Sequence, residues 1–319
     1  MLKWHELSKD LFLVKEQSKR VNRLNSLIIQ NEGPINPVLI DANYPFDFID
    51  DLYSKIKSAK MLLFSHGHLD HTGHGFYHQE HYNTPLFCPK QEIDYLIDLE
   101  TLMERVGFSR LELKDTYLMM VKDFMKFQEC KEVNSFIPGK DVFEFNSFLI
   151  ETIHIPGHSP GQTAFKISSK YEGFRKILFV ADIGSHPYYG DQNSDITQYR
   201  ESIDKLEKIY YEDDYILVPA HGNYYINKDP DFFNRIRRKI DNNKKKVLSA
   251  LTEKKPFSLR ELVQKRLITP ENRIVEPIKD LYYLWDGGMI YQHLQELISE
   301  GLVKEIEKGS FLSNRYILN

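Results

Sequence analysis

Ligand-type side chains crowd into residues 65–71 of this 319-residue chain, which read Ser-His-Gly-His-Leu-Asp-His. Four of them lie within six consecutive positions: His66, His68, Asp70 and His71. Imidazole and carboxylate groups bind zinc well, and they also suit iron and manganese. Crowding four such polar groups at the end of a strand has no benefit for the fold unless they bind a common ion. The motif therefore predicts a metal site.

An apolar run at residues 61–64 directly precedes this motif and predicts a buried strand that ends where the ligands begin. Three later candidates also follow predicted strands, which end at residues 155, 180 and 218: these are His158, Asp182 and His221. Because α/β sheets place their sites beyond the ends of strands, we expect all of these side chains to converge at one edge of the fold.

The number of candidates suits a site for two ions. Two ions that share one ligand need about seven protein ligands, and each ion keeps a position for water. The chain has that number: His66, His68, Asp70, His71, His158, Asp182 and His221. The sequence therefore predicts two divalent ions. Zinc is the expected metal, and iron or manganese remain open.

The spacing His-x-His-x-Asp-His resembles the signature of the metallo-β-lactamase superfamily. Its other motifs follow the expected order: Val-Leu-Ile-Asp-Ala-Asn at 38–43, Pro-Gly-His-Ser-Pro-Gly at 156–161, Phe-Val-Ala-Asp at 179–182 and Pro-Ala-His-Gly at 219–222. The resemblance covers residues 10 to 225 or so. One departure is Ala42-Asn43-Tyr44, which stands where the superfamily usually has a Thr-Gly pair.

The resemblance implies a fold and a division of the ligands. The fold would be an α/β protein, an αββα sandwich of two related halves. His66, His68 and His158 would hold the first ion. Asp70, His71 and His221 would hold the second, and Asp182 would bridge the two. Asp70 would also orient the nucleophile as a catalytic residue, and Asp41 would support the ligands without binding metal.

The implied activity is hydrolysis of a small ester, thioester or lactone by a metal-bound hydroxide. The stretch at 157–161 looks like the glyoxalase II form of its motif, although the basic C-terminal residues that bind glutathione in that enzyme have no convincing counterpart. His68 stands where diiron redox members carry Glu, which favours hydrolysis. Two alternatives stay open, a single-strand-specific endoribonuclease and a mononuclear iron persulfide dioxygenase.

Charge and composition narrow the partners. Residues 1–227 carry 24 Lys+Arg and 33 Asp+Glu, a net charge of −9, and residues 228–319 carry a net +5. An acidic catalytic region argues against nucleic acid and favours a small-molecule substrate. The chain contains no run of about 18 apolar residues, so we expect no membrane span. The two cysteines, Cys88 and Cys130, suit a reducing cytoplasm. A homodimer is left open.

The shift in charge predicts three parts: a catalytic domain at 1–227, a linker helix at 228–255 and a further unit at 256–319. We expect helices at 259–266, 277–285 and 289–300, with Gly287-Gly288 separating the last two, and a hairpin formed by 302–307 and 315–318. This order resembles a small winged-helix domain. The helix that would enter a DNA groove has no Lys or Arg, so we expect it to pack against protein instead.

A long insertion, about residues 91–135, separates the first motif from His158. Its apolar residues at helical spacing predict a helical hairpin with its own core, a lid over the metals, or both. Met and aromatic side chains would suit an apolar substrate. The candidate substrate-binding residues are Met119 and Phe124 in the insertion and Tyr188, Tyr189 and Tyr224 elsewhere.

Overall fold

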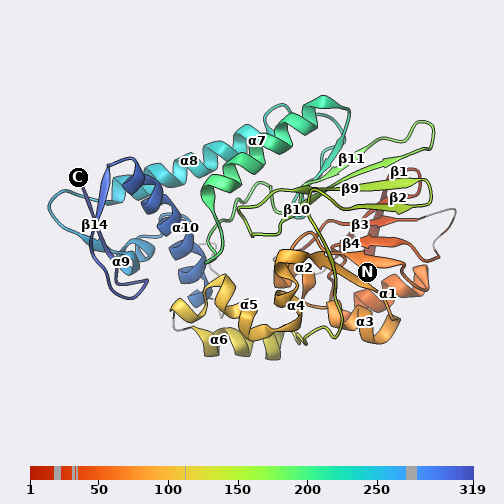
Figure 1. Cartoon of the computed structure of the whole chain (residues 1–319), viewed down its shortest axis with the longest axis horizontal. Helices are drawn as coiled ribbons and strands as arrows, with labels where there is room; N and C mark the ends of the chain where they lie inside the picture. The colour runs from red at the N-terminus through yellow and green to blue at the C-terminus, as the bar shows by residue number, and fades with distance from the viewer. Residues whose placement is uncertain (18–22, 31–32, 34, 112, 271–278) are drawn as a thin grey trace.

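The computed structural model describes residues 1–17, 23–30, 33, 35–111, 113–270 and 279–319. Two β-sheets lie face to face, with helices on both outer sides (Figure 1). Helix α1 (Phe46–Ile56) covers the first sheet, and α7 (Ile196–Glu212) covers the second. This arrangement is the αββα sandwich that the sequence predicts.

The first sheet runs in the order β1-β2-β3-β4-β5-β6-β7 among the described residues. Its strands are β1 (Leu2–Ser8), β2 (Leu11–Glu16), β3 (Ser26–Ile29), β4 (Val38–Ile40), β5 (Met61–Leu63), β6 (Leu86–Pro89) and β7 (Asn134–Phe136). Pairing is antiparallel from β1 to β4 and parallel from β4 to β7. The parallel half therefore brings the carboxyl ends of β4 and β5, and the residues that follow them, to one edge.

The second sheet has the order β12-β11-β10-β9-β8. Its strands are β8 (Val142–Phe145), β9 (Phe148–His154), β10 (Thr163–Ser169), β11 (Ile177–Phe179) and β12 (Ile216–Val218). Strands β11 and β12 are parallel, so Asp182 and His221 follow them at the same edge.

The core has two layers because successive side chains of a strand point to opposite faces. In β3, Leu27 and Ile29 pack between the two sheets, whereas Ile28 packs toward α1. All three side chains are fully buried. Short strands with both faces covered explain why the ligand motifs follow continuous apolar runs rather than alternating ones.

Helices fill the chain between β5 and β7. They are α2 (Leu69–Thr72), α3 (Gly75–Tyr82), η1 (Lys90–Glu92), α4 (Asp94–Ile97), α5 (Leu99–Val106), η2 (Ser109–Leu111), α6 (Lys114–Met119) and the π-helical turn η3 (Met120–Phe124). Asp98 caps α5 by accepting hydrogen bonds from two backbone N–H groups. Gly107 ends the helix in the left-handed conformation, with φ of +95°.

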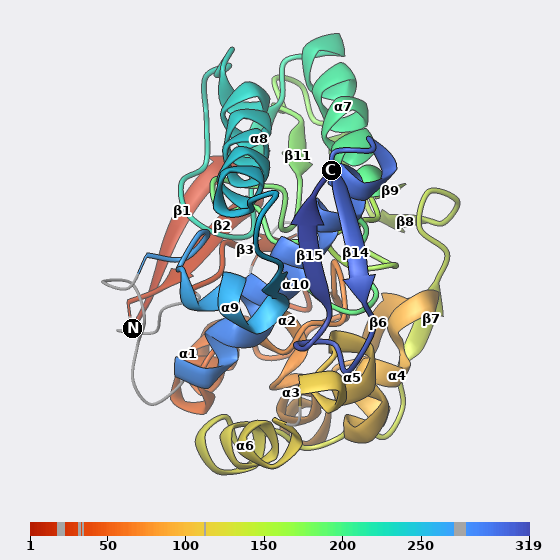
Figure 2. The ribbon, with the colours of Figure 1, turned by 90° about the vertical axis from the view of Figure 1, so that its left-hand side faces the viewer.

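The C-terminal part begins with α8 (Phe232–Ala250). It continues as β13 (Phe257–Ser258), α9 (Leu259–Gln264), α10 (Lys279–Ser299), β14 (Val303–Glu307) and β15 (Arg315–Leu318). The three strands form a small sheet in the order β13-β15-β14, of which β14 and β15 lie in front of α10 in Figure 2. Strand β13 was not expected. None of the described helices is long and apolar enough to cross a bilayer.

The expected break at Gly287-Gly288 is wrong, because α10 runs through both glycines without interruption. The start of the helix predicted at 277–285 falls partly outside the described residues. Glycine disfavours a helix by itself, but a tertiary contact decides here, since Gly288 lies directly against the backbone of Gly190.

Candidate metal centre

The seven predicted ligands lie in two adjacent groups at the shared edge of the sheets. His66, His68 and His158 form the first, and Asp70, His71, Asp182 and His221 form the second. Within each group, one ligand atom per residue lies within 4.8 Å of all the others. The loop after β5 and helix α2, which follows it, together supply four of the seven residues, so one short segment contributes to both groups.

The first group has the spacing of ligands around a single ion. His66 Nε2 lies 3.1 Å from His68 Nδ1 and 3.2 Å from His158 Nε2. Tetrahedral zinc with Zn–N bonds of 2.0–2.1 Å would separate its nitrogens by about 3.3 Å. Three imidazole nitrogens held this close fit a shared cation, and so the donor set suits the metal that the sequence predicts.

The second group mixes carboxylates and imidazoles. His71 Nε2 lies 3.1 Å from Asp182 Oδ1, and His221 Nε2 lies 3.2 Å from Asp70 Oδ2. Two carboxylates and two imidazoles would give this position more negative charge than the first, which suits a hard or borderline divalent ion.

Asp182 faces both groups. Its Oδ2 lies 3.4 Å from His158 Nε2, while its Oδ1 faces His71 and lies 3.6 Å from His221 Nε2. Ala181, just before it, has a φ of +47°, a costly conformation for a residue with a Cβ atom. Such strain at a ligand turn indicates that the surrounding structure holds Asp182 in this orientation.

Every histidine of the set directs its second ring nitrogen to an oxygen outside the cluster. The pairs are His66 Nδ1 with Ser65 Oγ (3.0 Å), His68 Nε2 with Asp191 Oδ2 (2.6 Å), His71 Nδ1 with Asp41 Oδ2 (2.8 Å), His158 Nδ1 with Tyr188 O (2.9 Å) and His221 Nδ1 with Arg23 O (3.3 Å). Partners of this kind fix the tautomer and the ring orientation, as they do around metal-binding histidines. The rings are therefore arranged as ligands.

Two buried carboxylates hold the ligand loops in place. Asp41 Oδ1 accepts a hydrogen bond from the Ser65 backbone N–H at 2.7 Å. Glu92, fully buried, accepts from the backbone N–H of Gly67 and from that of Gly161, each at 2.5 Å. Glu92 thus ties the loop of His66 and His68 to the loop that follows His158.

Charges within the centre shift the pKa values of its ligands. Burial lowers the pKa of His71, but Asp182 and Asp41 outweigh burial and raise that pKa well above its ordinary value. Burial also lowers the pKa of His68, yet Asp191 raises it to about 9 overall. Burial and the neighbouring His68 lower the pKa of His158 to about 4. The carboxylates thus make the site favourable for positive charge.

The second group is the open side of the centre. In this group the side chains of His221 and Asp70 are 31% and 26% exposed, against 12% for His68 and 2% for His158 of the first group. A substrate would therefore approach past Asp70 and His221.

The candidate substrate residues that the structure describes lie in different surroundings. Tyr189 is fully buried and its hydroxyl pairs with His293 Nε2 at 2.8 Å, away from the predicted ligands, so the structure gives it no substrate contact. Met119 is 51% exposed on the outside of the insertion, so the structure does not support it as a substrate contact. Tyr188 contacts His158 through its carbonyl, and Tyr224 lies near His5. The side chain of Phe124 lies outside the described part.

Three residues near the centre escaped the sequence reasoning: Glu92, Asp191 and Tyr117. Burial, followed by the carboxylates of Asp191 and Asp70, raises the pKa of Tyr117 well above its ordinary value. Tyr117 is 5% exposed and stacks on Phe108. None of the three stands in a motif, and the only signal for Asp191 is its position shortly after Asp182.

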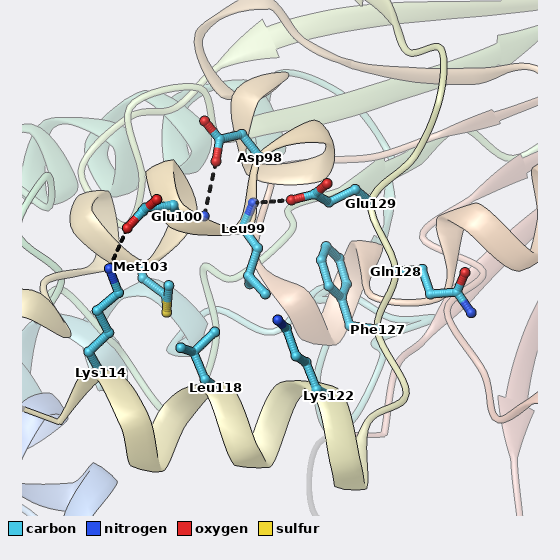
Figure 3. Close-up of a pocket in the computed structure, with 10 residues that line it drawn as sticks. All are labelled: Asp98, Leu99, Glu100, Met103, Lys114, Leu118, Lys122, Phe127, Gln128 and Glu129. Atoms are coloured by element: carbon cyan, nitrogen blue, oxygen red, sulfur yellow. Dashed lines mark hydrogen bonds and ion pairs between the residues drawn. The ribbon is translucent and has the colours of Figure 1, made fainter.

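A separate cleft of about 590 Å³ lies on the insertion (Figure 3). Apolar side chains, Leu99, Met103, Leu118 and Phe127, line it together with charged groups. Among the charged groups, Lys114 pairs with Glu100, and Glu129 accepts from the Leu99 N–H at 3.0 Å. None of the described ligand residues lines this cleft, so it is distinct from the metal centre.

Comparisons with known proteins agree with this geometry. The family model described as the metallo-beta-lactamase superfamily matches residues 25–221. The hydroxyacylglutathione hydrolase GloC of Haemophilus influenzae is 25% identical over 176 residues, which cover 52% of this chain and 70% of that protein.

Two solved structures share the fold over nearly the whole chain. A beta-lactamase domain protein from Burkholderia ambifaria superimposes with a TM-score of 0.72 at 17% identity, covering 99% of this chain and 94% of that one. A metallo-beta-lactamase family protein from Thermus thermophilus gives 0.71 at 16% identity, covering 98% and 100%. With the family model matching more than half of the sequence, the chain belongs to the metallo-beta-lactamase superfamily.

Proposed function

We propose that this protein is a hydrolase of small esters, thioesters or lactones that depends on two divalent metal ions, with zinc as the expected metal. The observation that carries the proposal is the pair of adjacent ligand groups joined by Asp182. The anchored second nitrogen of each histidine supports it, because such anchoring prepares a ring to bind metal.

Divalent ions at these positions would lower the pKa of a bound water and polarise the substrate carbonyl. The chain's own residues prepare that chemistry. Asp182 faces both groups and keeps them close together. Asp70 lies on the open side with a partly exposed carboxylate, so it can accept a hydrogen bond from the attacking water and orient it. The nearly closed first group limits the entry of bulk water.

Two observations favour a small acyl substrate. The relative from Haemophilus influenzae is named a hydroxyacylglutathione hydrolase, which points to a thioester as the first substrate class to test. The net charge of −9 over residues 1–227 favours a substrate other than a polyanion.

The C-terminal unit supports the same choice over ribonuclease activity. We take its order of α8-β13-α9-α10-β14-β15 as a winged-helix type of unit. One face of its long helix α10 lies against the catalytic domain. Gln292 donates to the Ser194 carbonyl at 2.7 Å, and His293 contacts Tyr189, so this face is packed on the catalytic domain. We propose that the unit packs rather than reads nucleic acid.

The test is a metal analysis joined to a substrate panel. Protein reconstituted with zinc should hold about two ions per chain and hydrolyse at least one of an aryl ester, a thioester and a lactone. Chelation should abolish this activity and zinc should restore it. Less than half an ion per chain would rule out the metal centre.

Variants sharpen the result. Asp182→Ala should weaken the binding of both ions, because Asp182 faces both groups. His158→Ala should weaken the binding of the first ion. The matched control is His81→Ala, since His81 is exposed and stacks on Tyr77 away from the ligands. Full metal content in Asp182→Ala would show that the residue is not shared.

A further inference from the structure

The loop at residues 188–191 orients two of the three histidines in the first ligand group. The Tyr188 carbonyl accepts from His158 Nδ1 at 2.9 Å, and Asp191 Oδ2 lies 2.6 Å from His68 Nε2. Within the loop, the Tyr188 hydroxyl donates to Asp191 Oδ1 at 2.6 Å. The positions of His68 and His158 therefore depend on where this loop lies.

Helix α10 contacts the loop backbone to backbone. A Cβ atom at Gly288 would lie 1.6 Å from the Gly190 carbonyl oxygen, and one at Gly190 would lie 2.6 Å from the Trp285 carbonyl oxygen. Real Cβ atoms do not approach backbone so closely, so no residue with a side chain fits at Gly288 without moving the loop. This contact explains a glycine in the middle of a long helix.

Side chains of α10 contact the loop and a residue shortly after it. His293 Nε2 lies 2.8 Å from the Tyr189 hydroxyl, and Gln292 donates to the Ser194 carbonyl at 2.7 Å. The Ser194 hydroxyl in turn donates to the His158 carbonyl at 2.7 Å. One helix of the C-terminal unit is thus connected to a metal ligand through a single intermediate residue.

The insertion meets the same point. Arg110 donates to the Gly190 carbonyl at 3.2 Å, and its guanidinium lies 4.0 Å from the centre of the Phe311 ring. Phe311 lies between β14 and β15, so the insertion, the loop and the C-terminal unit all converge on Gly190. A loop held from three sides has little freedom to shift.

We propose that α10 sets the position of loop 188–191 and thereby the orientation of His68 and His158, so that the C-terminal unit is required for the first metal position. The inference rests on the proposed metal-dependent function. Asp191 is a positioning residue in this scheme, because it acts through His68. The second metal position does not use the loop and should be unaffected.

Two neighbouring glycines give a matched test in the whole 319-residue chain. Gly288→Ala forces the loop away, whereas a Cβ at Gly287 would meet Val263 Cγ2 at an ordinary 3.5 Å. Both changes favour the helix equally. Zinc titration against a chromophoric chelator should show two binding steps in the wild type and in Gly287→Ala. His158→Ala should lose one of these steps, which identifies the first metal position. In Gly288→Ala the zinc affinity of that same step should fall about 10- to 100-fold, while the other step remains.

Two further variants keep the test decisive if Gly288→Ala does not fold. Asp191→Ala should weaken the same step about 10- to 100-fold, and Asp191→Asn should restore part of the affinity. Gln292→Ala removes one contact of α10 at a half-buried position and should weaken that step by about two- to tenfold.

The outcomes separate this inference from the proposed function. A wild type that binds no zinc contradicts the function itself. If the wild type shows two steps and Gly288→Ala keeps unchanged zinc affinity, that result overturns the role of α10 and leaves the proposed function intact. If Gly288→Ala does not fold, unchanged affinity in Gln292→Ala leads to the same conclusion. Unchanged affinity in Asp191→Ala overturns the role of the loop.

Discussion

Asp41 and His71 form a fully buried pair in which Asp41 Oδ2 lies 2.8 Å from His71 Nδ1. The same carboxylate accepts two hydrogen bonds from Ser65, one from its backbone N–H and one from its hydroxyl. Asp41 has a φ of +49°, a conformation that Asp tolerates better than most residues. The pair fixes the ring of His71 so that its Nε2 faces the second ligand group.

Asp41→Asn should weaken metal binding at the second position. Asn has only one oxygen to accept three hydrogen bonds, and its amide N–H₂ would face another donor. Losing a partner that orients a ligand costs about 10- to 100-fold in metal affinity. Zinc competition measures the effect, with the exposed Asp115→Asn as control. Equal affinity in both variants would show that the pair has no part in metal binding.

Glu92→Gln should destabilise the metal-free protein. The Gln amide can accept from one of the two backbone N–H groups, at Gly67 or Gly161, but it places its own N–H₂ against the other. An unsatisfied buried donor costs about 1–3 kcal/mol in the free energy of unfolding. Urea unfolding in chelator measures this cost. Glu129→Gln is the control, because Glu129 is exposed and accepts from one backbone N–H among the described residues, that of Leu99.

The outcome for Glu92→Gln also bears on the loops. If its stability equals that of the control, the two short contacts to Gly67 and Gly161 do not hold the ligand loops. A stability loss that excess zinc partly reverses is the expected result, because binding to the folded state adds to its stability.

The sequence predicts well which side chains come together, because these residues stand just beyond apolar strands and have groups suited to a metal. The seven residues do come together in the structure. Glu92 and Asp191 could not be found in this way. Their partners are backbone N–H groups and a histidine far away in the sequence, so their importance arises only once the loops meet.

Local propensity gives the wrong prediction at two secondary-structure elements. Gly287 and Gly288 predict a break by propensity, but the close approach of Gly190 makes a glycine necessary within a continuous helix. Strand β1 was missed because Trp4 and His5 are only half-buried, and its stability comes from pairing with β2. Tertiary contacts determine both features, and a sequence pattern does not contain them.

Acid should destabilise the protein through His78, which lies away from the ligands. Burial lowers the pKa of His78 to about 3, and the neutral ring pairs with the Tyr53 hydroxyl and the Ala42 carbonyl. Between pH 6.5 and 3 the unfolded chain binds a proton that the folded chain does not. Stability is therefore complete above pH 6.5 and falls as the pH decreases.

The variant His78→Gln isolates this contribution. Its unfolding free energy should lie below the wild-type value at pH 7, but the difference should shrink by about 2 kcal/mol at pH 5. Urea unfolding of both proteins in chelator gives the comparison, since other titrating groups cancel. A difference that stays constant between the two pH values would contradict the shifted pKa of His78.

Tyr117, rather than Met119, should affect turnover from the insertion. Burial, followed by the carboxylates of Asp191 and Asp70, raises the pKa of Tyr117, so its hydroxyl stays a donor, and we expect it to reach a substrate that enters on the open side. Tyr117→Phe should lower kcat/KM by about two- to tenfold with unchanged metal content. Met119→Ala is the control, because Met119 is exposed. Equal kinetics in both variants would make the insertion structural only.

Charge reversal on α8 separates an esterase from a nuclease. Lys244 pairs with Glu300 and is left intact, whereas Lys245 and Lys246 are exposed. In Lys245→Glu/Lys246→Glu, turnover of the ester or thioester should stay unchanged, and added salt should have little effect on KM. A nuclease must neutralise phosphates, so the same changes would weaken its binding, and its affinity would fall steeply with salt. Metal-dependent RNA cleavage that disappears on this charge reversal, without hydrolysis of any ester, thioester or lactone, would replace the proposed activity with a ribonuclease.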